Sequence, residues 1–86
     1  MEIDYSPTFI KRLKKAPKKI SIAFRNRLAI FIKEKYHPIL NNHWLTGRYL
    51  GFKSINVTGD WSAIFKEIGT HTIYFVELGT HSQLYK

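Results

Sequence analysis

The chain has 86 residues, enough for one folded domain and too few for a second. Hydrophobic residues make up 44% of it and aromatic residues 15%, so we expect a packed core, not a disordered segment. The absence of cysteine excludes disulfides and thiolate metal sites, and no apolar stretch is long enough to span a membrane. We therefore expect a single cytoplasmic domain over residues 1–86, without a signal peptide.

The charge is unevenly distributed along the chain, which carries a formal net charge of +8. Residues 1–50 hold eleven basic and three acidic side chains, whereas residues 51–86 hold three of each. Such a field attracts polyanions, which favours nucleic acid or an acidic protein as a partner. A solvated, lysine-rich helix surface would explain the same charge, so composition alone leaves both interpretations open.

The first part of the chain predicts a strand followed by two helices. Residues 2–5 alternate polar and apolar side chains, as in a short strand. The Ser6-Pro7 pair predicts a helix start, and Pro17 predicts the start of a second helix that ends at the His37-Pro38 pair. We expect the two helices to form an antiparallel hairpin. The buried stripe of the second helix is predicted to be Ile20, Phe24, Leu28 and Phe31.

The second part predicts a loop over residues 39–51 and then strands over residues 52–57, 61–67 and 72–78. The order strand-helix-helix-strand-strand-strand predicts an α+β fold, in which a helical hairpin covers one face of an antiparallel sheet. Alternation in the first of these strands puts Phe52, Ser54 and Asn56 on one side and Lys53, Ile55 and Val57 on the other. We expect Trp61, Phe65 and Phe75, in mid-strand, to lie in the core.

A few polar residues could carry out RNA cleavage without a metal ion. That reaction needs a base for the 2′-OH, an acid for the leaving 5′-oxygen and positive charge near the phosphate. Histidine suits either proton transfer, because its ordinary pKa lies close to neutral pH. No two histidines have metal-ligand spacing on one element, so we expect no metal site and no cofactor. The proton-transfer candidates are His43, Asp60, His81 and Tyr85, and the candidate cations are Lys53 and the helix lysines Lys11, Lys14, Lys15, Lys18 and Lys19.

Each of these candidates also has a purely structural explanation. His43 and His81 would be unremarkable as exposed surface side chains, and Asp60 after a glycine suits a tight turn. Tyr85 would pack equally well onto the core beside Leu84. Taken one at a time, therefore, these residues do not identify an enzyme.

Five short segments, taken together and in order, resemble the YafQ branch of the RelE/ParE toxin superfamily. That branch reads roughly His-Pro-Leu-x-Gly, Gly-aromatic-Arg, Pro-Asp-Trp and Gly-Thr/Ser-His followed by Leu-Phe. The spacing is nearly constant from residue 43 to residue 85, and the strand-helix-helix order of the first half agrees as well. The segments are His43-Trp44-Leu45-Thr46-Gly47, Gly51-Phe52-Lys53, Gly59-Asp60-Trp61, Leu78-Gly79-Thr80-His81-Ser82 and Leu84-Tyr85.

The resemblance implies a RelE-like toxin of a type II toxin–antitoxin system, an endoribonuclease that cleaves mRNA on the ribosome and so inhibits translation. It implies a cognate antitoxin with which the toxin, a monomer alone, forms a hetero-oligomer. The off-stripe residues Ile22 and Ile30 of the second helix are candidate antitoxin contacts. By position, His43, Asp60 and His81 match catalytic residues of the branch.

Two further positions also match the branch, and three depart from it. Tyr85 matches an aromatic residue that serves the reaction, and Lys53 occupies a position that is commonly basic. The three departures are Asn56 in place of a further catalytic histidine, and Ser62 and Glu77 in place of frequent arginines. Asn56 cannot transfer a proton as a histidine would, Ser62 cannot stabilise the phosphate as an arginine would, and Glu77 puts a carboxylate in place of a cation.

Two alternatives to the nuclease therefore remain at the level of the sequence. A toxin of the same fold without RNA chemistry, such as a ParE-like gyrase poison, would usually lack a histidine cluster. A catalytically weakened module that binds RNA or protein is favoured by the three departures.

Overall fold

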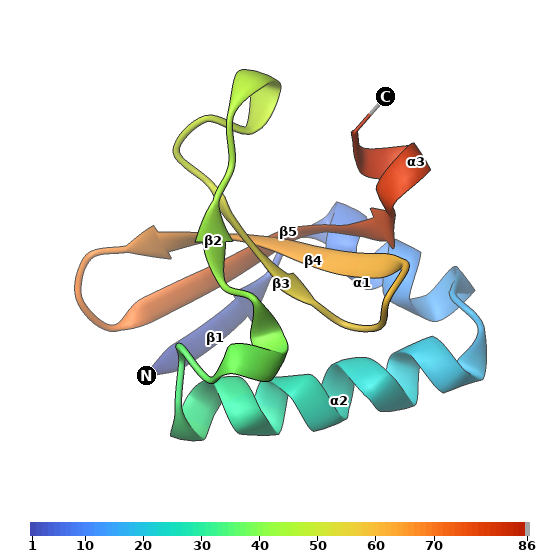
Figure 1. The fold of residues 1–86 in the computed structure, drawn as a ribbon, viewed down its shortest axis with the longest axis horizontal. Helices are drawn as coiled ribbons and strands as arrows, with labels where there is room; N and C mark the ends of the chain where they lie inside the picture. The colour runs from blue at the N-terminus through green and yellow to red at the C-terminus, as the bar shows by residue number, and fades with distance from the viewer. Residues whose placement is uncertain (86) are drawn as a thin grey trace.

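The computed structural model describes residues 1–85 as a sheet with helices on one face and two short segments on the other (Figure 1). Within these residues no helix is long and apolar enough to cross a membrane. The strands are β1 (Glu2–Tyr5), β2 (His43–Trp44), β3 (Lys53–Asn56), β4 (Trp61–Ile68) and β5 (Thr72–Thr80). The helices are α1 (Pro7–Lys15), α2 (Lys18–Lys33) and α3 (His81–Leu84), with 3₁₀ turns η1 (Pro38–Leu40) and η2 (Gly47–Tyr49).

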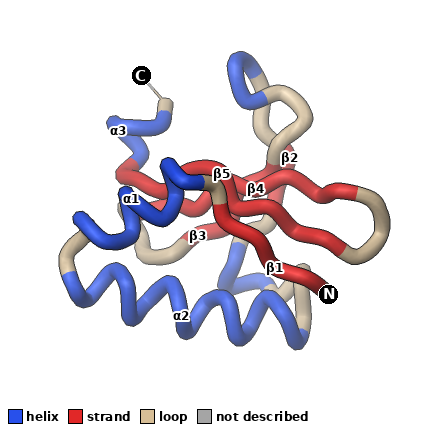
Figure 2. The backbone as a smooth tube through the Cα atoms, turned by 180° about the vertical axis from the view of Figure 1, so that it is seen from behind, coloured by secondary structure: helices blue, strands red, loops and turns tan. Residues whose placement is uncertain are grey.

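The sheet has the strand order β1-β5-β4-β3-β2, which confirms the predicted α+β class. It is mixed and not wholly antiparallel, however, because β1 pairs with β5 in parallel. A four-residue alternating segment does not determine its direction relative to a strand at the other end of the chain. That direction follows from where α1 and α2, which run in opposite directions (Figure 2), return the chain to the sheet.

The main core lies between the sheet and the two long helices. Its centre is a cluster of aromatic rings at centroid separations of 5.1 to 6.0 Å. The Ser6 hydroxyl accepts a hydrogen bond from Phe9 N and donates one to Val76 O, which ties the start of α1 to β5. The aromatic members of this core are Phe9, Phe24, Phe31, Phe65 and Phe75.

Helix α2 is shorter than predicted, because it ends at Lys33 and not at the proline. The chain becomes extended at Glu34, and His37 caps η1 by accepting a hydrogen bond from Ile39 N through its Nδ1 atom. The proline thus begins a 3₁₀ turn after the helix has already ended.

The segment from β2 to η2 and the helix α3 rise together from the other face of the sheet (Figure 1). The sequence predicted only a loop and a polar tail at these two places. A capping box begins α3: Thr80 Oγ1 accepts from Gln83 N, and Gln83 Oε1 accepts from Thr80 N. A small second core holds both segments down, and it consists of Leu45, Ile64 and Leu84 with Tyr49, Phe52 and Val76.

Candidate catalytic face

Alternation in β3 and β4 separates the main core from a second, polar side of the sheet. Ile55 and Ala63 face the main core, so their neighbours face the segments that rise from the opposite side. His43 is paired with Ser54 across β2 and β3, and paired residues share a face. We call this side the open face, and among its polar residues are His43, Ser54, Asn56 and Ser62.

His81 is held over the open face by two contacts. As the first residue of α3, it donates a hydrogen bond from its backbone N–H to Asp60 O at 3.1 Å. Its ring Nε2 lies 3.1 Å from the hydroxyl oxygen of Ser62, which is only 2% exposed. The ring is therefore oriented by a buried hydroxyl group while the residue itself remains exposed.

Tyr85 extends from α3 toward the η2 segment. Its ring centroid lies 5.9 Å from that of His81 and 6.4 Å from that of Tyr49. Its hydroxyl group donates a hydrogen bond to Ser54 Oγ at 3.4 Å. Leu84, and not Tyr85, packs in the second core, so Tyr85 stays 43% exposed above the open face.

His43 lies on the open face, and one contact determines which of its ring nitrogens faces away from the chain. Its ring Nδ1 is 2.7 Å from the backbone oxygen of Asn41. Because a carbonyl oxygen can only accept, Nδ1 carries the hydrogen, and in the neutral ring Nε2 keeps its lone pair. The side chain is exposed, so this lone pair is accessible to a ligand.

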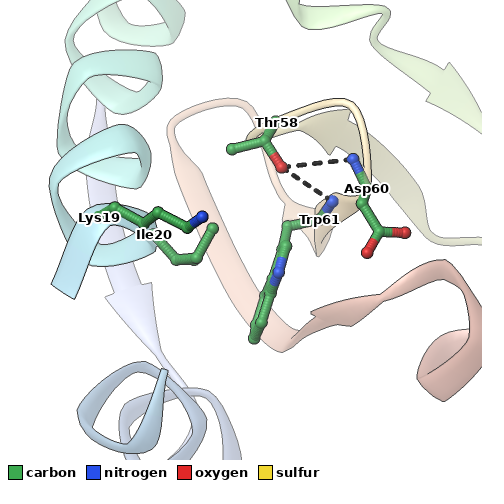
Figure 3. Close-up of a pocket in the computed structure, with 5 residues that line it drawn as sticks. All are labelled: Lys19, Ile20, Thr58, Asp60 and Trp61. Atoms are coloured by element: carbon green, nitrogen blue, oxygen red, sulfur yellow. Dashed lines mark hydrogen bonds between the residues drawn. The ribbon is translucent and has the colours of Figure 1, made fainter. Parts of the chain in front are cut away.

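Asp60 lies in the turn between β3 and β4, beside the start of α3. Its backbone oxygen accepts the hydrogen bond from His81 N, so it supports His81 through the main chain. Figure 3 shows its carboxylate turned away from Lys19 and Trp61. The neighbouring Thr58 hydroxyl holds the turn by accepting from Asp60 N and Trp61 N.

Lys53 lies on the side of the sheet opposite to His81, because it is paired with Phe65 of the main core. It is 5% exposed, and its ammonium group donates to the Tyr36 hydroxyl at 3.0 Å and contacts a Glu67 oxygen at 3.1 Å. Burial alone would lower the pKa of Lys53, but these hydrogen bonds and the charge of Glu67 outweigh it and raise the pKa. Lys53 is therefore not part of the open face, contrary to its predicted role as a contact for RNA.

Glu77 and Arg12 form an ion pair at the edge of the sheet. Glu77 lies at an irregularity opposite Ile64, and its Oε1 is 3.4 Å from Arg12 Nε on α1. The negative charge that the sequence placed near the site is thus offset by a cation from another element. Sequence reasoning missed this pairing, because the two residues are far apart along the chain.

The remaining predicted cations are exposed lysines outside the open face. Lys15 lines a depression that it shares with Gln83 of α3, so this part of α1 lies next to the helix that carries His81. Within residues 1–85, no three side chains of the types that bind metal ions cluster together. The exposed lysines are Lys11, Lys14 and Lys15 of α1 and Lys18 and Lys19 of α2.

Two buried serines are functional candidates that the sequence reasoning did not select. Ser62 contacts His81, and Ser54 contacts Tyr85. The alternation in β3 placed Ser54 on the same side as Asn56, but nothing local indicated which side chain would reach it. The sequence marks Ser62 only as a position where the family frequently has arginine.

Comparisons with known proteins agree with this architecture. The sequence model of a family described as a bacterial toxin of type II toxin-antitoxin system, YafQ, matches residues 1–86. The crystal structure of YafQ from E. coli strain BL21(DE3) has a TM-score of 0.82 and 24% identity, covering 99% of this chain and 98% of that chain. A chain of the E. coli DinJ-YafQ toxin-antitoxin complex has a TM-score of 0.79 and 25% identity, with coverages of 99% and 97%.

A more distant match is the YoeB/ParE toxin from Agrobacterium tumefaciens, with a TM-score of 0.77. Its identity is 9%, and the match covers 94% of this chain and 99% of that chain. This likeness concerns the fold alone. No curated protein sequence matches the chain.

Proposed function

The chain belongs to the YafQ family of toxins of type II toxin-antitoxin systems, and we propose that it is an endoribonuclease that cleaves mRNA on the ribosome. One observation carries the proposal: His81 and Tyr85 are in ring contact above the sheet face on which His43 also lies. Two imidazoles and a phenol over one polar face suit a reaction that moves one proton away from RNA and another onto it.

In the proposed reaction, the 2′-oxygen of a nucleotide attacks its own 3′-phosphorus, and the bond from phosphorus to the next 5′-oxygen breaks. His43 Nε2 takes the proton of the 2′-OH, because its Nδ1 is occupied by Asn41 O. Protonated His81 gives a proton to the leaving 5′-oxygen. The products are a 2′,3′-cyclic phosphate and a free 5′-OH, so protons and bonds balance.

Three further residues would position these groups. Ser62 holds Nε2 of His81, which leaves Nδ1 to deliver the proton. Tyr85 orients the nucleotide, with its own hydroxyl fixed by Ser54. Asp60 acts through its backbone oxygen, which anchors the first residue of α3.

The three departures from the family pattern predict a slow enzyme. Asn56 and Ser62 carry no positive charge, and Glu77 is offset by Arg12 instead of adding a cation. Loss of one donor that stabilises transition-state charge costs roughly 10²–10³ in kcat in other enzymes. Protonated His81 would supply positive charge beside the leaving oxygen.

We also propose an antitoxin partner and, because mRNA is read there, action in the cytoplasm. The DinJ-YafQ structure is that of a toxin-antitoxin complex, and we expect this chain to form one of the same kind. Ile22 on α2 is 50% exposed and is a suitable contact. Ile30 packs against the main core, so it is less suited to this role than the sequence suggested.

Translation with the purified protein tests the nuclease. We expect the wild-type protein to cut a ribosome-bound message, as mapped by primer extension, and His81→Ala to lose about 10²-fold or more of the rate. His71→Ala is the matched control, because it removes an exposed imidazole from the turn between β4 and β5. The proposal is wrong if the message stays intact, or if His81→Ala cuts as fast as the control.

A further inference from the structure

We propose that a basic groove between α1 and α3 binds the single-stranded RNA that continues from the open face. The inference rests on the proposed function, since it takes RNA as the substrate. It also divides the helix lysines into two classes, those that line the groove and those that do not.

The groove consists of three shallow depressions that share residues. The first lies on α1, the second between α1 and α3, and the third at the start of α2. Arg12 and Lys15 line both the first and the second, and Trp61 lines both the second and the third. The depressions therefore form one track from α1, past α3, to the start of α2. The other lining residues on which the proposal depends are Lys11, Gln83 and Lys19, one in each depression.

The track passes directly beside the helix that carries the catalytic candidate. Gln83 follows His81 by two residues on α3, so an RNA strand crossing α3 would leave the imidazole and enter the groove. Gln83 Oε1 is occupied by Thr80 N, which leaves the amide N–H groups of Gln83 to donate to a ligand. The RNA path thus needs no rearrangement of the capping box.

The charge of the groove suits a phosphate backbone. It is lined by four cations, of which Arg12 is already paired with Glu77. Lys11 and Lys15 are four residues apart and so lie on one side of α1. Asp60 is the one acidic residue that lines the three depressions described here, and Figure 3 shows its carboxylate turned away from Lys19.

The shape and chemistry of the groove favour RNA over a helix of a partner protein. An amphipathic helix needs a continuous apolar stripe to bury its own apolar face. Here Ile20 belongs to the core, and the half-buried indole of Trp61 shares its two depressions with three cations, one amide and the carboxylate of Asp60. Cations combined with an aromatic surface are typical of sites for single-stranded nucleic acid.

Lys14 and Lys18 provide an internal control. Both are exposed and lie on the same two helices, but neither lines any of the three depressions. The variant pairs Lys15→Gln/Lys19→Gln and Lys14→Gln/Lys18→Gln therefore remove equal charge from neighbouring positions. If RNA binding depended only on net charge, both pairs of substitutions would weaken it equally.

The experiment measures binding of a short, labelled 2′-O-methyl RNA, which has no 2′-OH to react, across a series of salt concentrations. All variants carry His81→Ala as well. We expect the groove pair to weaken binding about tenfold and to reduce the salt slope by about 1.4, or about 0.7 for each lost phosphate contact. The control pair should change the affinity by less than about twofold.

Two outcomes would overturn the proposal. Equal losses in both pairs would mean that the lysines act only through the net charge. If the groove pair keeps its RNA affinity but loses binding of an oligoglutamate peptide, the groove is a docking site for an acidic protein segment. Neither result affects the nuclease proposal, because the measurement involves no cleavage.

Discussion

The buried hydroxyl of Ser62 and the exposed imidazole of His81 are joined by a hydrogen bond of 3.1 Å, although nineteen positions separate them in the chain. This contact relates one of the departures from the family pattern to the proposed acid. A serine at this position brings no positive charge, but its hydroxyl group contacts Nε2 of the ring and leaves Nδ1 without that contact. The hydrogen bond thus orients the exposed ring of His81.

Ser62→Ala should lower kcat about tenfold and leave KM nearly unchanged, because a lost positioning contact affects the transition state more than binding. The measurement is the multiple-turnover rate of cleavage over a range of concentrations of ribosome-bound message. Ser21→Ala is the control, since it removes a half-buried hydroxyl from α2, on the other side of the sheet. Wild-type kcat in Ser62→Ala would contradict the positioning role.

Gly79→Ala should displace α3 and reduce both activity and stability. A Cβ atom at Gly79 would lie 2.9 Å from Gln83 Oε1 and 3.3 Å from Leu84, so either Gln83 gives up its hydrogen bond in the capping box or α3 shifts. Overpacking of this kind costs about 1–3 kcal/mol, measured by urea denaturation. Gly59→Ala is matched, because nothing lies within 4 Å of its added Cβ. Equal stability of the two variants would show that α3 is not packed as described.

The carboxylate of Glu67 should make stability depend on acid pH. Its hydrogen bond with Lys35 lowers its pKa against the opposing effect of burial, and the hydrogen bond and charge of Lys53 lower it further. A lowered pKa contributes stability above the unfolded-state value, and this contribution is lost as pH falls through the folded value.

Glu67→Gln should therefore be destabilised by about 1 kcal/mol at neutral pH and equal to wild type in strong acid. Chemical denaturation across a pH series measures the difference. Glu34→Gln, which alters an exposed carboxylate, should show little effect at any pH. A pH-independent difference for Glu67→Gln would exclude the ion pairs as its cause.

Tyr85→Phe should retain most of the activity, whereas Tyr85→Ala should lose about tenfold or more. Phenylalanine keeps the ring contacts with His81 and Tyr49 and gives up only a long hydrogen bond to Ser54. The test is the cleavage rate of both variants on the same message. If both lose activity equally, the hydroxyl group takes part in the reaction and the ring contact does not explain the role of Tyr85.

Much of the fold was predictable from local pattern. The alternation in β3, the caps at Ser6 and the apolar stripe of α2 each reflect the geometry of a single element. The β2 strand and α3 were missed because they are very short and are held by the second core, whose members come from four separate segments of the chain. The pairing of Glu77 with Arg12 depends on the register of β5 in the sheet and on how α1 crosses it, and no local sequence pattern encodes either.

By itself, the sequence determined one basic domain, the order of its main helices and strands and the alternation of side chains along β3. Those properties follow from backbone alternation, helical periodicity and charge, which act over a few neighbouring residues. Only the tertiary structure decided that Ser62 meets His81, that Tyr85 reaches Ser54 and that Lys53 is buried on the other side of the sheet. Such contacts arise from the register of strands and the packing of distant segments, and their energies exist only once the whole chain is folded.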